Sequence, residues 1–157
     1  MFQGSVVGIF VAPAASAPME ARDEIEAIVG VGLEGDRYAS ATGTYSGHRV
    51  PDYQRAVTLI ERETIVAVRA ETGLAFDDIE TRRNLVTVGV PLNHLVDREF
   101  DVGPVRLRGV NLSEPCVYLE REVRDGLRAA LIHRGGLRAE ILVGGPIRLG
   151  DLVRPSP

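Results

Sequence analysis

The sequence predicts a fold that is mainly β with a few helices, of the α+β class, in one domain that spans residues 1–157. Short β-branched segments bounded by Gly, Pro, Asp or Asn recur through the chain, which is typical of a sheet or a small barrel. Two segments with apolar residues at helical spacing interrupt them. A chain of 157 residues can bury one sizeable core and is too short for two ordinary domains.

Six segments are predicted as strands from their β-branched residues and from the turn residues that flank them. They cover residues 5–11, 57–60, 85–88, 105–110, 139–143 and 147–149, and residues 25–29 form a weaker candidate. Gly144, Gly145 and Pro146 separate the last two of the six, which predicts a tight turn and a C-terminal hairpin.

Two helices are predicted between the strands. In residues 61–71, Ile65 and Val68 share one face, and Gly73 is placed to end the helix. In residues 120–133, an apolar stripe lies opposite charged side chains, and two glycines follow at 135 and 136. The stripe consists of Val123, Leu127, Ala130 and Leu131.

Residues 38–53 have neither a helical nor a strand period and are rich in Ser, Thr and Gly. They are predicted to form a mobile surface loop. Such a loop is either a lid over a pocket or an insertion without a role.

The chain contains no lysine, so all eighteen of its basic side chains are arginine. This excludes a P-loop lysine, a pyridoxal-phosphate Schiff base and a lysine nucleophile, and pyridoxal phosphate is not expected as a cofactor. A single cysteine excludes a cysteine-rich zinc or iron–sulfur site within the chain. The histidines at 48, 94 and 133 lie about 40 residues apart and form no local metal-binding motif.

The net charge and the hydropathy of the chain exclude further classes of protein. A net charge of −4 argues against a protein that binds nucleic acid non-specifically. No apolar run approaches the ~18 residues needed to cross a bilayer, so no membrane association is expected. Residues 1–11 lack the basic and apolar regions of a secretory signal, and one cysteine cannot form an intrachain disulfide. We therefore expect a soluble, cytoplasmic protein.

The segment at residues 30–37 is rich in glycine. Gly30, Gly32 and Gly35 permit positive φ, and successive exposed N–H groups can form an anion-binding nest. The alternative is a turn whose Asp36 caps the loop and pairs with an arginine.

Arg82, Arg83 and Asn84 stand immediately before the predicted strand 85–88. Two guanidinium groups and an amide suit a ligand that bears oxyanions. At the start of a strand, alternation could aim one arginine inward and the other outward. The alternative is two solvated arginines that form ion pairs with nearby acidic residues.

Cys116, the only cysteine, follows Pro115 after the predicted strand 105–110. Free cysteine is most often a small buried hydrophobe. Pro115, however, has a fixed φ and restricts its own predecessor, so it presents Cys116 in a defined direction. Neighbouring arginines would favour the thiolate, which is the nucleophilic and metal-ligating form. Cys116 is thus either the centre of a site or an inert core residue.

Residues 133–138 read His-Arg-Gly-Gly-Leu-Arg. The glycines suit a helix C-cap and a close chain crossing. His133, predicted in the last helical turn, is favoured there by the helix dipole even without a chemical role. Arg138 is an equally plausible structural or ligand-binding residue.

Together, five pieces of the sequence resemble the MOSC family, the domain named for the C-terminal part of molybdenum cofactor sulfurase. No single piece is specific, but five in the family's order are difficult to obtain by chance, and they span nearly the whole chain. The pieces are Gly-Leu-Glu-Gly-Asp-Arg at 32–37, Ala-Val-Thr-Leu-Ile-Glu at 56–61, Arg-Arg-Asn-Leu at 82–85, Pro-Cys at 115–116 and the segment 133–151.

The resemblance implies a MOSC-like β-barrel with a cleft that binds or modifies the molybdenum cofactor, a molybdopterin. It makes Cys116 the catalytic residue, which carries sulfur as a persulfide or ligates molybdenum in members that act as reductases. The residues expected to bind the cofactor are Arg83, Asn84, Gly35, Asp36, Arg37 and Arg138.

Three functions are compatible with the resemblance. In the first, the domain accepts or transfers sulfur through a Cys116 persulfide. The chain contains no pyridoxal-dependent desulfurase domain, so a separate desulfurase would supply the sulfur and a molybdoenzyme would receive the product. In the second, Cys116 ligates molybdenum in a reductase of N-hydroxylated compounds, although the N-terminal extension of the larger reductases is missing. In the third, the domain is a non-catalytic cofactor- or partner-binding module.

Overall fold

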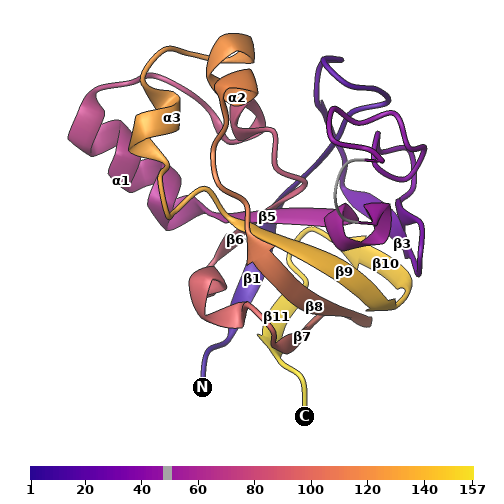
Figure 1. Ribbon diagram of the computed structural model, residues 1–157. Helices are drawn as coiled ribbons and strands as arrows, with labels where there is room; N and C mark the ends of the chain where they lie inside the picture. Colours follow the sequence, from indigo (N-terminus) through magenta and orange to yellow (C-terminus); the bar gives the residue numbers. More distant parts are fainter. Residues whose placement is uncertain (48–50) are drawn as a thin grey trace.

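The computed structural model describes residues 1–47 and 51–157. Within these ranges seven strands form a closed barrel in the spatial order β11, β7, β8, β9, β5, β6, β1, and pairing of β1 with β11 closes it (Figure 1). Neighbouring barrel strands are antiparallel, except for β5 and β6, which are parallel. The barrel strands are β1 (Gly4–Val11), β5 (Val57–Glu61), β6 (Leu85–Val88), β7 (Glu99–Val102), β8 (Val105–Leu112), β9 (Leu137–Val143) and β11 (Leu152–Pro155).

Helices and a small second sheet surround the barrel. Helix α1 (Arg62–Thr72) lies in the crossover between the two parallel strands, and α2 (Val117–Glu122) and α3 (Leu127–Ala130) lie in the connection from β8 to β9. None of the helices in the described ranges is long and apolar enough to cross a membrane. The remaining elements are β2 (Glu20–Ala21), which pairs with β1, the sheet of β3 (Glu24–Ile28), β4 (Gly32–Leu33) and β10 (Gly145–Arg148), and the 3₁₀ helices η1 (Asp52–Arg55), η2 (Asp78–Thr81) and η3 (Leu92–Leu95).

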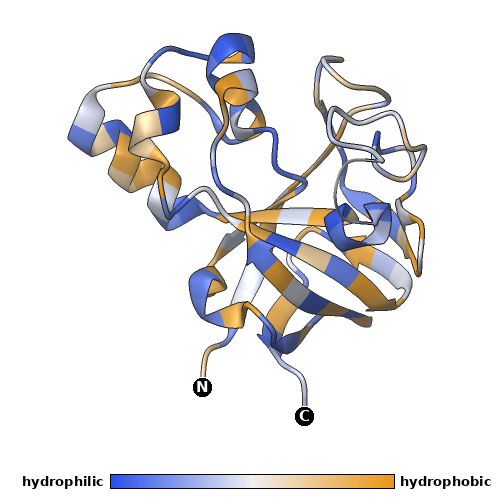
Figure 2. Ribbon diagram, viewed as in Figure 1, coloured by the Kyte–Doolittle hydropathy of each residue, from blue (hydrophilic) through white to orange (hydrophobic). Residues whose placement is uncertain are grey.

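Two hydrophobic clusters hold these layers together. Alternate residues of the barrel strands, such as Leu59 and Leu85, are fully buried inside the barrel. Figure 2 shows this alternation as orange and blue bands along β8 and β9. Their neighbours Ile60 and Val86 face outward and pack in a second cluster with the apolar sides of the three helices. The helices are thus fixed against the outer wall of the barrel at β5 and β6.

The structure confirms the mainly β fold and the barrel. Each predicted strand coincides with or overlaps a barrel strand or β10, and the weaker candidate at 25–29 overlaps β3. The predicted helix at 61–71 is α1, and it ends as expected at Gly73, which has a φ of 71°. Strands β7 and β11 were not predicted.

The predicted C-terminal hairpin is wrong. Strand β10 does not pair with β9; it pairs with β3, where Ile147 lies opposite Ile25. Only Gly144 separates the two strands, which leaves too few residues for a two-residue hairpin loop. A Cβ on Gly144 would come within 2.7 Å of the carbonyl oxygen of Ala27, so glycine permits the close approach to β3 here.

The predicted helix at residues 120–133 is also wrong as a single element. The chain forms α2 and α3 instead, and Gly126 between them has a φ of 88°. Leu127 and Leu131 keep the predicted burial, so the apolar stripe was correct although the helix is broken. His133 lies beyond the end of α3 in the left-handed region, with a φ of 62°, and therefore not in a last helical turn.

Candidate functional site

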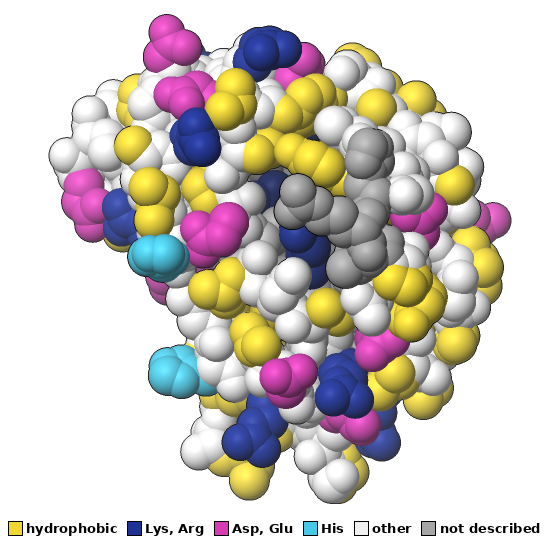
Figure 3. Space-filling view, viewed as in Figure 1, with side chains coloured by type: hydrophobic (Ala, Val, Ile, Leu, Met, Phe, Trp, Pro, Cys, Tyr) yellow, Lys and Arg dark blue, Asp and Glu magenta, His cyan; other side chains and the backbone are white. Residues whose placement is uncertain are grey.

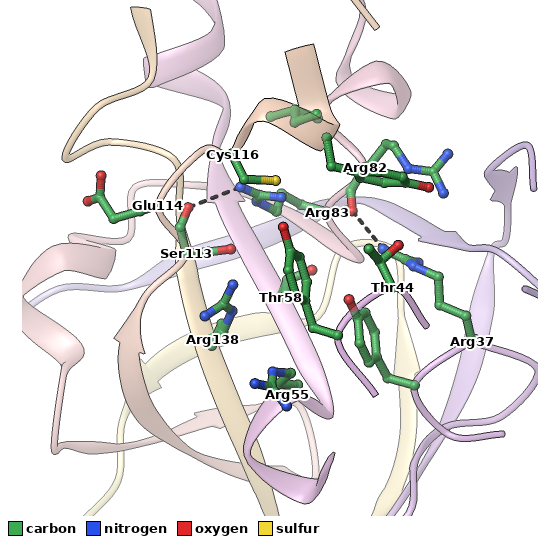
Figure 4. Close-up of a pocket in the computed structure, with 14 residues that line it drawn as sticks. Arg37, Thr44, Arg55, Thr58, Arg82, Arg83, Ser113, Glu114, Cys116 and Arg138 are labelled. Atoms are coloured by element: carbon green, nitrogen blue, oxygen red, sulfur yellow. Dashed lines mark hydrogen bonds between the residues drawn. The ribbon is translucent and has the colours of Figure 1, made fainter. Parts of the chain in front are cut away.

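A cavity lies against the outer wall of the barrel, between α2 and the loop that follows β4 (Figure 4). Loop 38–53 was predicted to be either a lid or an insertion without a role, and its described part supplies Tyr38, Thr44 and Tyr45 to the lining. The lining residues come from five separate segments of the chain. They are Arg37, Tyr38, Thr44, Tyr45, Arg55, Thr58, Arg82, Arg83, Ser113, Glu114, Cys116, Tyr118, Leu119 and Arg138.

The cavity is strongly basic although the chain is acidic. Arg37 and Arg55 pair with Asp36 and Asp52 at 3.0 and 3.9 Å. The other three arginines of the lining have no carboxylate within 4.0 Å in the described part of the chain. Figure 3 shows arginine side chains in dark blue, recessed in a hollow at the centre of this face. Three uncompensated guanidinium groups in one cavity indicate a binding site for an anion. They are Arg82, Arg83 and Arg138.

The two arginines before β6 both line the cavity, contrary to the expected division into one inward and one outward side chain. Arg82 has a φ of 58°, and this left-handed residue interrupts the strand alternation before β6 begins at Leu85. Arg82 also donates a hydrogen bond to the carbonyl oxygen of Ala17, while its other terminal nitrogen is buried without a partner among the described residues.

Arg83 is held in place by the backbone on either side of α2 and α3. Its Nε donates to the carbonyl oxygen of Gly135 at 2.8 Å, and its Nη2 donates to that of Ser113 at 3.0 Å. Burial, followed by the charge of Arg138, lowers the pKa of Arg83 to about 10, so the guanidinium remains charged at neutral pH. The arrangement fixes a positive charge beside the thiol of Cys116 (Figure 4).

Cys116 is the residue before the first turn of α2 and is partly exposed to the cavity. Burial raises the pKa of its thiol. Hydrogen bonding to Tyr45 and to the backbone N–H groups of Leu119 and Tyr118, together with the charge of Arg83, outweighs burial and holds the pKa below that of a free thiol. Burial and the hydrogen bond to Cys116 raise the pKa of Tyr45 to about 12, so its phenol keeps the proton that it donates.

The geometry predicts that Cys116 reacts as a thiolate and that Tyr45 contributes to this reactivity. The rate of alkylation by iodoacetamide should reach half of its maximum at a pH below the pKa of free cysteine. Tyr45→Phe should move this midpoint to higher pH and reduce the rate at neutral pH several-fold, because the thiolate loses a donor. Tyr53→Phe is the matched control, since Tyr53 is exposed and does not line the cavity. A midpoint that is the same in both variants would contradict the role of Tyr45.

Three of the residues expected to bind the cofactor do not line the cavity. Asn84 is buried, where its side chain accepts from the backbone N–H of Thr58 and donates to the carbonyl oxygen of Phe10 and to Asp36. Asp36 is also buried and accepts from Arg37, which is the arrangement of the turn alternative for residues 30–37. Gly35 supplies a left-handed residue to that turn, with a φ of 82°. Asp36 and Asn84 therefore support the wall of the cavity from behind.

Several lining residues were not predicted from the sequence. Tyr38, Thr44 and Tyr45 belong to a loop without a period, and Arg55 belongs to η1, so no local pattern marked them. One feature of the composition could have indicated that this loop lines a site. Two of the four tyrosines of the chain lie within residues 38–45.

The described residues contain no group of three or more His, Cys, Asp or Glu side chains that could hold a metal ion. His133 pairs with Glu114 at the rim, with 3.3 Å between Nδ1 and Oε1, and His94 does not line the cavity. His48, the third histidine of the chain, lies outside the described residues. Of the side chains that line the cavity, Cys116 is the soft ligand available to a metal.

Fold and site together define a class: a small closed β-barrel with one partly exposed thiol in an arginine-lined cavity on its outer wall. The family model of the MOSC domain matches residues 35–154. The chain therefore belongs to the MOSC domain family, which is related to the molybdenum cofactor. A comparison with curated proteins found no significant match.

Solved structures agree with this fold. The YuaD protein from Bacillus subtilis superposes with a TM-score of 0.80 at 16% identity, over 98% of this chain and 97% of that protein. YiiM from Geobacillus stearothermophilus superposes with a TM-score of 0.74 at 14% identity, over 98% and 75% of the two chains. YiiM from Escherichia coli superposes with a TM-score of 0.64 at 17% identity, over 100% of this chain and 70% of that protein.

The chemistry of the cavity fits a molybdenum cofactor. A thiolate suits a soft metal, and the guanidinium groups suit the phosphate of a pterin. The volume of the cavity, about 50 Å³, holds a group of the size of a phosphate, and the rest of a cofactor would extend beyond it.

Proposed function

We propose that this MOSC domain accepts and transfers sulfur through a persulfide on Cys116, at a site that holds a molybdopterin-type cofactor. The observation that carries the proposal is the position of the thiol. Cys116 lies in the arginine-lined cavity beside Arg83, with Tyr45 as a hydrogen-bond donor, and its pKa is lowered. An inert core cysteine has neither a cavity nor stabilisation of its thiolate.

The residues of the cavity divide into two roles. Arg83 and Tyr45 stabilise the negative sulfur of Cys116. Arg138, Arg82 and Arg37 would hold the phosphate of the cofactor, while Asn84, Asp36 and Gly35 would contribute through the wall rather than by direct contact. When bound, the cofactor supplies a metal at which a sulfur ligand can be exchanged.

Sulfur acceptance is a displacement at the outer sulfur of a donor persulfide. The Cys116 thiolate forms a bond with that sulfur, the S–S bond of the donor breaks, and its electron pair leaves with the donor thiolate. The product is the Cys116 persulfide, and no external oxidant or reductant is consumed. Because the thiolate attacks and the thiol does not, the donors around Cys116 increase the fraction of reactive protein at neutral pH.

A donor and a recipient are required. The chain contains no lysine to hold pyridoxal phosphate, so we propose that a separate desulfurase loads Cys116 and that a molybdoenzyme uses the product. A single unpaired cysteine agrees with a reducing compartment, so we propose a cytoplasmic setting.

The test is sulfur uptake measured by intact-protein mass spectrometry. Incubation with a small alkyl persulfide should add one sulfur atom to the wild-type chain, and a reductant should remove it. Cys116→Ser should gain none. Equal uptake by Cys116→Ser, or no uptake by the wild type, would contradict the proposal. Glu114→Gln is a folding control, because it changes the rim of the cavity and leaves the thiol in place.

A further inference from the structure

The size of the cavity around Cys116 limits what can reach the thiol. Its volume is about 50 Å³. A cavity needs about 10–15 Å³ of volume to hold one water molecule, so this cavity has room for a few waters. A tetrahedral oxyanion has this size. The space beside the thiol can therefore hold a small inorganic anion.

Three of the arginines that line this space, Arg82, Arg83 and Arg138, have no carboxylate partner among the described residues. The side chain of Arg138 takes part in none of the hydrogen bonds or ion pairs found among the described residues, and it lies close enough to Arg83 for its charge to lower the pKa of Arg83. Like charges of this kind repel one another in a cavity that is partly shielded from water. A dianion between them would relieve the repulsion, and Thr44 and Ser113 add hydroxyl groups to the lining.

We propose that the cavity binds thiosulfate, or a small thiosulfonate of the same charge class, and that Cys116 takes its sulfur directly from this donor. The inference rests on the proposed sulfur-carrier function and adds the substrate class. The sulfonate oxygens would occupy the space between Arg138 and Arg83, and the outer sulfur would meet the thiol of Cys116. A small-molecule donor can thus replace the desulfurase at this site.

The reaction is balanced without a further reactant. The Cys116 thiolate attacks the outer sulfur of thiosulfate and forms a new S–S bond. The bond between the two sulfur atoms of thiosulfate breaks, and its electron pair leaves with sulfite. The thiol sulfur is oxidised to the persulfide level while the central sulfur of the donor is reduced to sulfite. Arg138 and Arg83 would stabilise the leaving sulfite by their charge.

Binding is tested first by protection. Sulfate is the inert probe, and it should slow alkylation of Cys116 in the full chain in a saturable manner, while chloride at the same ionic strength should not. Arg138→Gln should weaken the protection by about tenfold, the size of one charge-assisted hydrogen bond. Arg148→Gln should leave the protection unchanged, because Arg148 is exposed and pairs with Glu24. Equal protection by the two salts would overturn the proposed anion site.

Transfer is tested by mass and by sulfite release. Wild-type protein with thiosulfate should gain one sulfur and release one sulfite for each sulfur gained. Arg138→Gln should slow the reaction with thiosulfate about tenfold more than the reaction with a neutral alkyl persulfide, and Arg148→Gln should leave both rates unchanged. Uptake from the alkyl persulfide without uptake from thiosulfate would overturn this inference and leave the sulfur-carrier function standing. Uptake from neither donor would overturn both.

Discussion

Asp36→Ala should lower the free energy of unfolding by about 3–5 kcal/mol, because it removes one partner of a buried ion pair. The side chain of Asp36 is 1% exposed and accepts hydrogen bonds from Arg37 at 3.0 Å and from the backbone N–H of Ala12 at 3.1 Å. It also accepts from the backbone N–H of Tyr38 and from Asn84, each at 3.3 Å. Alanine would leave the guanidinium of Arg37 buried without its carboxylate.

The measurement is guanidinium chloride unfolding at equilibrium, with Glu20→Ala as the matched control. Glu20 also pairs with an arginine, at 2.7 Å from Arg22, but both side chains are exposed, so its loss should cost about 0.5 kcal/mol or less. The loss of unfolding free energy in Asp36→Asn should lie between those of the two alanine variants, because asparagine keeps two acceptor positions and loses the charge. Similar destabilisation by Asp36→Ala and Glu20→Ala would show that Asp36 does not organise the cavity wall.

The local pattern was sufficient for strands and helices whose own consecutive residues show how they are buried. Residues 57–60 and 85–88 are apolar because both faces are covered, by the barrel interior and by the helices, and both were predicted as strands. The partner of β10 was not predictable in this way. Ile147 packs opposite Ile25, which lies far earlier in the chain, and the local glycines point equally to a hairpin.

The same distinction between local pattern and long-range pairing applies to the residues of the candidate site. Arg83, Cys116 and Arg138 stand in short recognisable pieces of sequence, and the structure brings them to one cavity. Asn84 also stands in such a piece, but its side chain forms hydrogen bonds with the backbone of Thr58 and Phe10 inside the wall. These bonds depend on strand pairing, which a local sequence pattern does not show. Tyr45 contributes to the thiol only because its loop folds over the cavity.

The paired glycines before β9 illustrate how backbone geometry builds the site. Gly136 has a φ of 108°, and a Cβ at this position would collide with the carbonyl oxygen of Leu59 on β5. Its own carbonyl accepts from the backbone N–H of Ser113 at 2.7 Å. The carbonyl of the preceding Gly135 holds Arg83. Close approach of β9 to β5 and the position of Arg83 therefore depend on the same two residues.

Gly136→Ala should lower the free energy of unfolding by about 2–5 kcal/mol, as the sum of a left-handed conformation that costs about 1–2 kcal/mol and overpacking that costs about 1–3 kcal/mol. Gly30→Ala is the matched control, since Gly30 has a φ of 73° but open space around its missing Cβ, so only the conformational cost of about 1–2 kcal/mol applies. In Gly136→Ala that still folds, Arg83 should lose its fixed position, and alkylation of Cys116 at neutral pH should slow. Equal unfolding free energies for the two variants would mean that β9 moves away from β5 without cost, and the glycine pair would then not be what places Arg83 beside the thiol.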